Sequence, residues 1–249
     1  MATQGVEFAN VSFTLEGGRQ LLSDVSVRVE AGSTTALLGR SGSGKTTLLR
    51  TVNELVAPTS GEVRVAGKAT REYDTIALRR SIGYVIQETG LFPHMTVERN
   101  AGMALELAGR PTQEIAARVR EVLALAGLEY AEFRARYPWQ LSGGQRQRVG
   151  LARALATDPM VLLMDEPFGA LDPLTRAEMQ TMLRGLLEKV GKTVLLVTHD
   201  LDEALYLAKR LVFLDKGQVV ADLAANEVLG SENPHVKAYV QAVHRAVPA

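Results

Sequence analysis

The chain has 249 residues, of which 46% are hydrophobic and 22% are charged, as in ordinary soluble globular proteins. Its 28 basic and 28 acidic residues cancel, which argues against a broad basic surface for nucleic acid. Cysteine is absent from the sequence, which excludes disulfides and thiolate metal sites. No signal peptide is recognisable at the start, and no apolar run approaches the roughly 20 residues that span a bilayer. We therefore expect any membrane role to come through a partner chain.

The first quarter of the chain has the patterns of two kinds of strand and one helix. Apolar and polar residues alternate over residues 6–29, which predicts half-buried antiparallel strands joined by a turn at 17–19. The short apolar run at 34–39 predicts a strand that is buried on both faces. A helical spacing of apolar residues follows over 48–56, and Pro58 is expected to close this helix.

The middle of the chain changes from strands to helices. A strand is predicted at 61–67, between two glycines, and the next strand is predicted at 82–87. From 88 to 157 only helical periodicities occur. This change predicts a helical subdomain inserted into an α/β core.

Strands return in the last third, at 160–165, 193–198 and 211–215. Between the first two lies a helix with Asp172 as N-cap and Pro173 at its first position. Six apolar side chains are expected on the inner face of this helix: Leu174, Met179, Met182, Leu183, Leu186 and Leu187. Strands that alternate with helices imply a parallel sheet with right-handed crossovers.

A phosphate-binding loop is predicted between the strand at 34–39 and the helix after it. "GRSGSGKT" matches G-x-x-x-x-G-K-[ST] in the strand-to-helix context that this loop requires. Its glycines let backbone N–H groups converge on phosphate oxygens, Lys45 would reach the β- and γ-phosphates, and Thr46 would bind Mg²⁺. The predicted ATP-binding residues are Gly39, Arg40, Ser41, Gly42, Ser43, Gly44, Lys45, Thr46 and Thr47.

Four polar residues that end or directly follow predicted strands complete the chemistry. Asp165 ends the strand at 160–165 and can hold Mg²⁺, while the adjacent Glu166 is placed to polarise a water for attack on the γ-phosphate. His199 follows a strand expected to neighbour the phosphate-binding loop, so we expect it to face the γ-phosphate. Gln87 can contact Mg²⁺ or water and act as a hinge. The metal ligands are thus predicted to be Thr46, Gln87 and Asp165.

With "LSGGQ" and "GALD", these motifs resemble the ATP-binding subunit of ABC transporters. The resemblance runs over about residues 6–222 and keeps the family's motif order. It implies a P-loop NTPase fold with a mainly parallel sheet, an N-terminal antiparallel β-subdomain and an inserted α-helical subdomain. The expected division is an ATPase core at 1–87 and 158–222, a helical signature subdomain at 88–157, and a short C-terminal helical tail at 223–249 that is too short for a regulatory domain.

The family pattern further implies a head-to-tail homodimer with two ATP molecules at its interface. The signature turn would cover the ATP of the other subunit, through Leu141, Ser142, Gly143, Gly144 and Gln145. Ser142 is expected to cap a helix whose N-terminus can bind the γ-phosphate. Gly169 opens the D-loop, whose other residues are Ala170, Leu171 and Asp172. In this scheme Glu166, His199 and Gln87 are the catalytic residues.

The subunit is expected to sit on the cytoplasmic side of the membrane, held by a transmembrane permease and linked indirectly to a solute-binding protein. The segment at 81–100 resembles bacterial importers of osmoprotectants such as glycine betaine, choline and carnitine. Amino-acid and other small-solute importers share much of it and stay an alternative. An ABC-type ATPase that acts on DNA or ribosomes is disfavoured by the neutral single cassette. A regulatory module without catalysis is disfavoured by Glu166 and His199.

Three details stay open at this point. Members of the family usually stack an aromatic side chain on adenine, but the aligned position holds Leu15. Either Leu15 makes a plain apolar contact, or Phe13 or another aromatic substitutes. "GLFPHMTV" either grips the permease or forms a local core cluster. Arg146 and Arg148 gain nothing from the dipole at the start of their helix, so an interface or a structural partner is expected for them.

Overall fold

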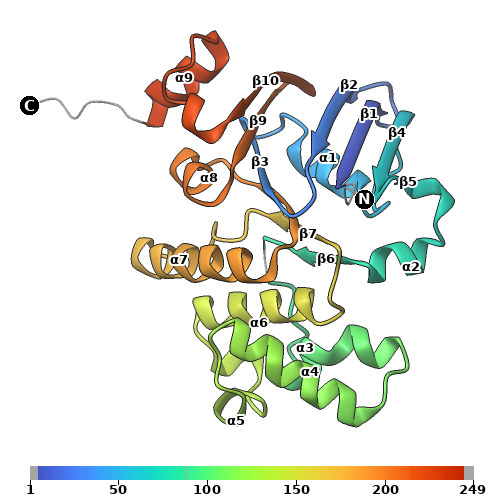
Figure 1. Ribbon diagram of the computed structural model, residues 1–249, viewed down its shortest axis with the longest axis vertical. Coiled ribbons are helices and arrows are strands. Elements are labelled where there is room, and N and C mark those ends of the chain that lie inside the picture. Colours follow the sequence, from blue (N-terminus) through green and yellow to red (C-terminus); the bar gives the residue numbers. More distant parts are fainter. Residues whose placement is uncertain (1–4, 88, 244–249) are drawn as a thin grey trace, which may run out of the picture. The chain divides into compact units, whose positions relative to one another are not determined.

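The computed structural model describes residues 5–87 and 89–243. Glu88 and the ends of the chain, including parts of the predicted core and tail, lie outside the described residues. The chain forms two compact units, one from Met1–Thr75 and Thr193–Ala249 and the other from Ile76–Lys192 (Figure 1). In Figure 1 the first unit shows both the blue and the red colours of the scale, because its two segments lie far apart in the sequence.

The first unit contains an antiparallel sheet with the strand order β2-β1-β4-β5. Its strands are β1 (Val6–Thr14), β2 (Gln20–Val29), β4 (Ser60–Val65) and β5 (Lys68–Ala69). Val6 pairs with Val29 on one side and with Val65 on the other, and all three are buried. Alternation therefore points one face of each strand at the core, which confirms the antiparallel prediction for residues 6–29.

The strands β3 (Thr34–Leu38), β8 (Thr193–Val197), β9 (Arg210–Asp215) and β10 (Gln218–Ala224) form the second sheet of this unit. β3 pairs in parallel with both β8 and β9, and every residue of β3 and β8 is buried, as the continuous apolar runs predict. β10 runs antiparallel to β9 and was missed by the sequence analysis. None of its residues is fully buried, so it lacks the apolar pattern that identifies a strand.

Among the described residues, the α-helices that accompany these sheets are α1 (Lys45–Thr51), α8 (Leu201–Leu207) and α9 (Pro234–Val243). The helix predicted to run on to Pro58 ends earlier, at Thr51. The Thr51 hydroxyl donates to the Leu48 carbonyl at 2.7 Å, and Glu54 adopts a φ of 55°, which a helix does not tolerate. The chain therefore leaves the helix through a left-handed residue and not through the proline.

The second unit joins a pair of parallel strands to a set of helices. β6 (Ile82–Val85) pairs in register with β7 (Val161–Asp165), from Ile82 opposite Val161 to Val85 opposite Met164. The helices of this part of the chain are α2 (Thr75–Arg80), α3 (Val97–Leu107), α4 (Thr112–Leu125), α5 (Tyr130–Phe133), α6 (Gly143–Leu155) and α7 (Pro173–Val190). The described residues between 89 and 157 contain helices and no strand, which confirms the predicted helical segment.

The helix α7 begins as its sequence predicts, but one of the side chains expected on its inner face points outward. Asp172 caps it by accepting from the Thr175 N–H at 3.1 Å, and Gly191 ends it with a φ of 59°. Leu174 was expected on the inner face with Leu183, yet it is 79% exposed. Nine residues separate the two, which at 3.6 residues per turn places them on opposite sides of the helix.

A buried asparagine organises the loop that precedes α3. The side chain of Asn100 accepts from the Phe92 N–H at 2.8 Å and donates to the carbonyls of Phe92, Met95 and Thr96 at 3.0–3.1 Å. Asn100 has no exposed surface, while Phe92 is 38% exposed. The loop is therefore tied down from inside, and the Phe92 ring is presented at the surface.

We expect Asn100→Ala to lower the free energy of unfolding by about 2–3 kcal/mol, because it leaves several loop groups without their partner. Equilibrium unfolding in urea measures the change. The matched control is Arg99→Ala on the exposed side of the same helix, where a 3.8 Å ion pair to Glu106 contributes within about 0.5 kcal/mol. Equal stabilities of the two variants would contradict the structural role of Asn100.

Candidate functional site

The phosphate-binding loop of the first unit lies between β3 and α1 and depends on its glycines. Gly39, Gly42 and Gly44 have φ values of 152°, 78° and 100°, in the region that side chains disfavour. A Cβ on Gly39 would lie 2.2 Å from the Leu214 carbonyl oxygen. Nothing would obstruct a Cβ on Gly42, so there the backbone conformation alone requires glycine.

Lys45 is held inside this loop. Its ammonium donates to the carbonyl oxygens of Gly39 at 2.7 Å and Arg40 at 3.0 Å, and the residue is only 6% exposed. The buried Ser43 hydroxyl has no hydrogen-bond partner within the described residues. Since buried polar atoms in proteins normally find a partner, this hydroxyl and the ammonium fit a ligand that brings several acceptor oxygens, as a nucleotide phosphate does.

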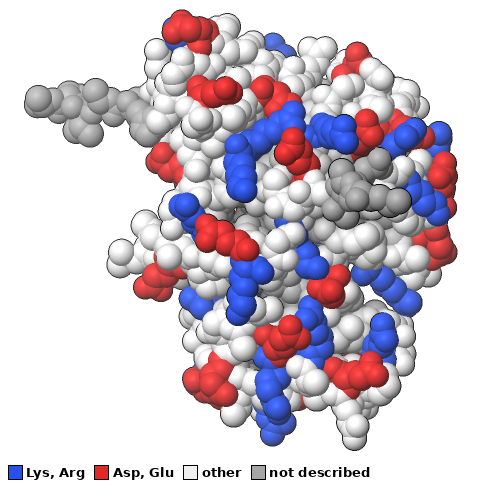
Figure 2. Space-filling model, viewed as in Figure 1, with Lys and Arg blue, Asp and Glu red and all other residues white. Residues whose placement is uncertain are grey.

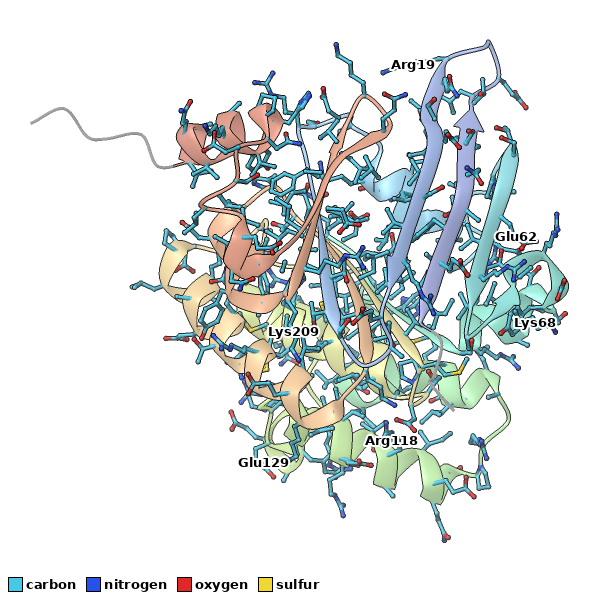
Figure 3. All side chains as sticks on the ribbon, turned by 45° about the horizontal axis from the view of Figure 1, so that its top comes forward. Arg19, Glu62, Lys68, Arg118, Glu129 and Lys209 are labelled. Carbon is cyan, nitrogen blue, oxygen red and sulfur yellow. The ribbon has the colours of Figure 1, made fainter. Side chains whose placement is uncertain are left out.

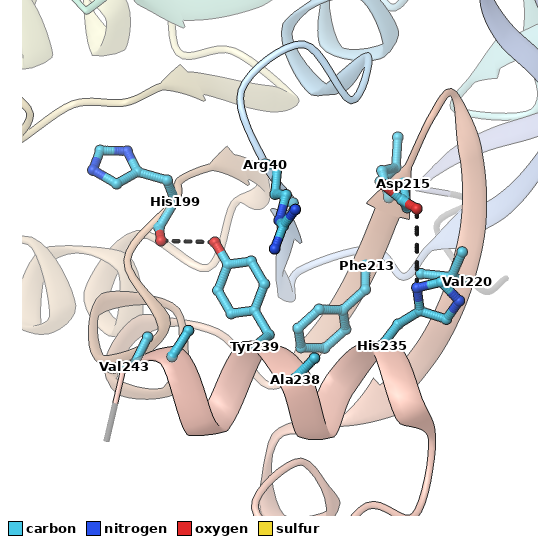
Figure 4. Close-up of a pocket in the computed structure, with 12 residues that line it drawn as sticks. Arg40, His199, Phe213, Asp215, Val220, His235, Ala238, Tyr239 and Val243 are labelled. Atoms are coloured by element: carbon cyan, nitrogen blue, oxygen red, sulfur yellow. Dashed lines mark hydrogen bonds and ion pairs between the residues drawn. The ribbon is translucent and has the colours of Figure 1, made fainter. Parts of the chain in front are cut away.

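His199 belongs to the same unit as the loop and lies close to it. Leu37 of β3 pairs with Val197 of β8, so Gly39 and His199 each follow two residues after this pair. Both line one pocket of roughly 470 Å³ together with Arg40 (Figure 4). The expectation that the strand before His199 neighbours the strand before the loop is therefore confirmed.

The two residues considered for the adenine contact lie at the end of β1. Phe13 is half-buried and pairs across the sheet with Leu22. Leu15 is 40% exposed and begins the turn to β2, where its N–H donates to the Arg19 carbonyl at 2.9 Å. Both side chains have accessible surface to offer a base.

The second unit brings together three of the predicted residues. Asp165 is the last residue of β7, is 6% exposed, and accepts from the Tyr84 hydroxyl at 3.3 Å. Glu166 follows with a φ of 46°, a strained conformation of the kind that concentrates at functional sites. The Gln87 amide donates to the Glu166 carboxylate at 3.4 Å. The pairing of β6 with β7 thus places Gln87 and Glu166 side by side.

The signature turn opens α6 through a reciprocal cap. Gln145 donates its backbone N–H to the Ser142 hydroxyl at 3.2 Å, and its side chain accepts from the Ser142 N–H at 2.9 Å. The expectation that Ser142 caps a helix is confirmed. A Cβ on Gly144 would lie 2.8 Å from the Thr175 methyl group, so a glycine there lets the start of α6 approach the start of α7.

The two arginines near this turn have structural partners. Arg146 donates to the Leu141 carbonyl at 2.7 Å, and Arg148 to the Ala126 carbonyl at 3.2 Å. Of the two alternatives considered for these arginines, an interface or a structural partner, the structural partner therefore has direct support. These contacts reach outside the helix, so no local sequence signal identifies them.

Two further residues of α6 escaped the sequence analysis. Gln147 is buried and donates to the Pro167 carbonyl, which ties α6 to the loop that follows Glu166. Arg153 donates to the carbonyls of Thr89 and Gly90, both at 2.7 Å. Burial lowers the pKa of the Arg153 guanidinium. Gln147 lies in the polar first half of the helix, so its burial cannot be read from periodicity, and Arg153 is half-buried among the apolar residues of the second half.

The side chains proposed to bind Mg²⁺ all offer oxygen ligands. Thr46 supplies a hydroxyl, Gln87 an amide and Asp165 a carboxylate, all oxygen ligands that a hard cation prefers. Across the described residues, no cluster of three or more histidine, cysteine, aspartate or glutamate side chains could hold a metal by itself. Each of the three donors therefore has the oxygen chemistry that Mg²⁺ prefers.

Comparison with known proteins defines the class. The ABC transporter family matches residues 22–169, more than half of the chain, and the chain belongs to this family. The match includes the phosphate-binding loop, Gln87, the signature turn, Asp165 and Glu166, so the protein is an ABC-type ATPase. Where the structure is described, no helix is both long and apolar enough to cross a membrane.

Several relatives are named as ATP-binding proteins of transport systems. The chain is 50% identical over 215 residues to the glycine betaine uptake system ATP-binding protein YehX of Escherichia coli, covering 86% of this chain and 69% of that protein. It is 44% identical over 222 residues to the choline transport ATP-binding protein OpuBA of Bacillus subtilis, covering 88% and 58%. The sulfate/thiosulfate import ATP-binding protein CysA of Nocardia farcinica is 48% identical, with coverage of 86% and 66%. The resemblance to osmoprotectant importers is therefore confirmed, although the chain spans only part of the length of these relatives.

Solved structures agree with the fold. The ATP-binding cassette MJ0796, in a dimeric post-hydrolysis state bound to ADP and phosphate, matches 88% of this chain and 98% of its own, with a TM-score of 0.78 and 36% identity. The protein cbiO1 of Clostridium perfringens, part of the transporter complex cbiONQ, matches 96% of both chains with a TM-score of 0.84 and 27% identity. The predicted class, an ABC ATPase core with an antiparallel β-sheet and a helical insertion, is confirmed.

Proposed function

We propose that this chain is the ATP-hydrolysing subunit of a bacterial importer and that it drives uptake of a quaternary-amine osmoprotectant. The observation that carries the proposal is the buried Lys45 ammonium, held across a glycine loop beside an unpartnered Ser43 hydroxyl. The solute class rests on the relatives that act on glycine betaine and choline. The subunit would lie at the cytoplasmic face of the membrane through its permease.

Each site residue has a defined task in this proposal. The loop N–H groups and Lys45 bind the phosphates of ATP, and Glu166 accepts the proton of the attacking water. His199 holds the γ-phosphate. Thr46, Asp165 and Gln87 would hold Mg²⁺, which neutralises phosphate charge. The hydrogen bond from Gln87 to Glu166 supports a shared role for these two side chains, because it orients the carboxylate before water arrives.

The catalytic unit is proposed to be a homodimer in which the signature turn acts on the ATP of the other subunit. The capped start of α6 offers backbone N–H groups and the positive end of a helix dipole to the γ-phosphate. ATP then binds two surfaces in the closed dimer and one in the open form, and this difference in affinity drives closure. The dimeric structures of MJ0796 support this arrangement.

The segment at 89–100 is proposed to contact the permease. Asn100 fixes this loop, and the exposed Phe92 ring meets the His94 ring edge-on at 6.0 Å. A rigid aromatic surface of this kind suits a stable protein contact. Acidic and basic side chains are interspersed on the face of each unit visible in Figure 2, which supports a protein partner over nucleic acid.

Uptake by the reconstituted transporter tests the solute class. The subunit is co-expressed with a candidate permease and a candidate solute-binding protein, and ATP-dependent uptake of labelled glycine betaine, choline, sulfate and amino acids into vesicles is compared. We expect quaternary amines to be taken up, and ATP hydrolysis to rise with them. The similarity to CysA keeps another small-solute importer as the second candidate, and uptake of sulfate alone would establish it.

A further inference from the structure

The C-terminal helix α9 is anchored to the ATPase core at its first turn. The Asn233 side chain accepts from the His235 N–H at 2.9 Å and donates to the Val220 carbonyl at 2.9 Å, so one residue caps α9 and joins it to β10. Val236 is fully buried in a cluster with residues of β3, β9 and α8. The helix is therefore a packed part of the first unit, and its inner face has a fixed position.

Tyr239 lies one turn after Val236 on the same face of α9. Its ring meets the Phe213 ring edge-on, with centroids 5.8 Å apart. Its hydroxyl donates to the backbone carbonyl of His199 at 2.7 Å, as Figure 4 shows. A residue 40 positions along the chain thus contacts the backbone of the histidine proposed to hold the γ-phosphate.

The backbone on either side of His199 is also held. The Thr198 N–H donates to the Leu37 carbonyl at 3.2 Å, and the Asp200 N–H donates to the Thr198 hydroxyl at 3.0 Å. Asp200 then caps α8 by accepting from the Glu203 N–H at 3.0 Å. The hydrogen bond from Tyr239 adds the carbonyl of His199 itself, so it restrains the peptide plane between residues 199 and 200.

This contact borders the phosphate-binding loop. Tyr239, His199, Gly39 and Arg40 line the same pocket, and Figure 4 shows the Arg40 side chain directed into the space that Tyr239 also faces. The His199 residue is exposed. A small rotation of the peptide that carries it would move the imidazole ring relative to the loop.

We propose that Tyr239 is a positioning residue for ATP hydrolysis, which holds the His199 backbone so that its imidazole meets the γ-phosphate. This inference rests on the proposed role of His199. This role requires no contact between Tyr239 and ATP. Its hydroxyl acts through the histidine, and α9 thereby becomes part of the catalytic framework.

The test is Tyr239→Phe in the full chain, which keeps the ring against Phe213 and removes the hydroxyl. We expect kcat for ATP hydrolysis to fall roughly 5- to 20-fold with the KM for ATP unchanged, because binding by the loop is untouched. In a His199→Ala background the same change is expected to have no further effect, since the two residues act as one unit. The matched control is Tyr73→Phe, because the Tyr73 hydroxyl donates to the Val65 carbonyl at 2.9 Å elsewhere in the same unit.

The outcomes separate this inference from the proposed function. A wild-type kcat in Tyr239→Phe, together with a large loss in His199→Ala, would overturn the positioning role and leave the ATPase intact. An equal loss of kcat in Tyr73→Phe, or a further loss in the double variant, would also overturn it, because both would indicate general destabilisation. Absence of turnover in the wild-type chain would overturn both proposals.

Discussion

Lys45→Ala is expected to reduce ATP hydrolysis by roughly 100-fold or more, because it removes a preorganised cation from the place where phosphate charge must be stabilised. The same ammonium joins the carbonyls of Gly39 and Arg40, so the variant also loses the bonds that close the loop. Nucleotide affinity should fall together with turnover. Binding of a fluorescent ATP analogue and release of phosphate measure the two effects.

The control for this variant is Lys68→Ala. Lys68, labelled in Figure 3, is exposed in the same unit. Its ammonium lies 4.5 Å from the centroid of the Tyr73 ring. Its loss removes one positive charge without touching the loop, and turnover should stay at the wild-type level. Full hydrolysis by Lys45→Ala would show that the glycine loop is not the ATP site.

Glu166→Gln is expected to bind ATP normally, to lose turnover by about 10²- to 10⁴-fold, and to accumulate as an ATP-loaded dimer. The amide has nearly the shape of the carboxylate but cannot accept a proton from water. Its oxygen can still accept from Gln87, which donates to the Glu166 carboxylate at 3.4 Å in the wild-type chain. Light scattering after size-exclusion chromatography in ATP measures the dimer.

The control is Glu178→Gln on α7, an exposed glutamate in the same unit with the same charge change. This variant should hydrolyse ATP and should not accumulate as a dimer. If Glu166→Gln stays monomeric at saturating ATP, the ATP-sandwich dimer is wrong. If it hydrolyses ATP at the rate of Glu178→Gln, Glu166 is not the base.

Much of the fold can be predicted from the spacing of apolar residues along the sequence alone. The alternation at residues 6–29 and the short apolar runs of β3, β7 and β8 identify strands, because a strand buries one face or two. The caps at Asp172 and Ser142 identify helix starts, since each satisfies backbone donors within three residues. The prediction fails where the pattern of apolar residues does not match the face that is buried. Leu174 is apolar but lies on the outer face of α7, and β10 is a strand without an apolar face.

The candidate site likewise contains some residues whose role the sequence predicts and others whose contacts it does not. The residues of "GRSGSGKT" and "MDE" are contiguous, and their chemistry can be read from their order, because a loop between strand and helix binds phosphate through neighbouring backbone groups. The partners of Arg146, Gln147 and Arg153 cannot be read in this way. Each donates to a carbonyl that no spacing rule connects to it.

The sequence by itself determined the class of this protein, its phosphate-binding loop and its acidic pair after β7, because each is a local motif that carries its own chemistry. Only the tertiary structure decided that Lys45 bridges two carbonyls and that Gln87 meets Glu166. It also decided that Tyr239 reaches the backbone of His199. Each of these contacts joins residues that are not neighbours in the sequence. Each stabilises the fold only when the packed core brings its donor and acceptor within hydrogen-bond distance.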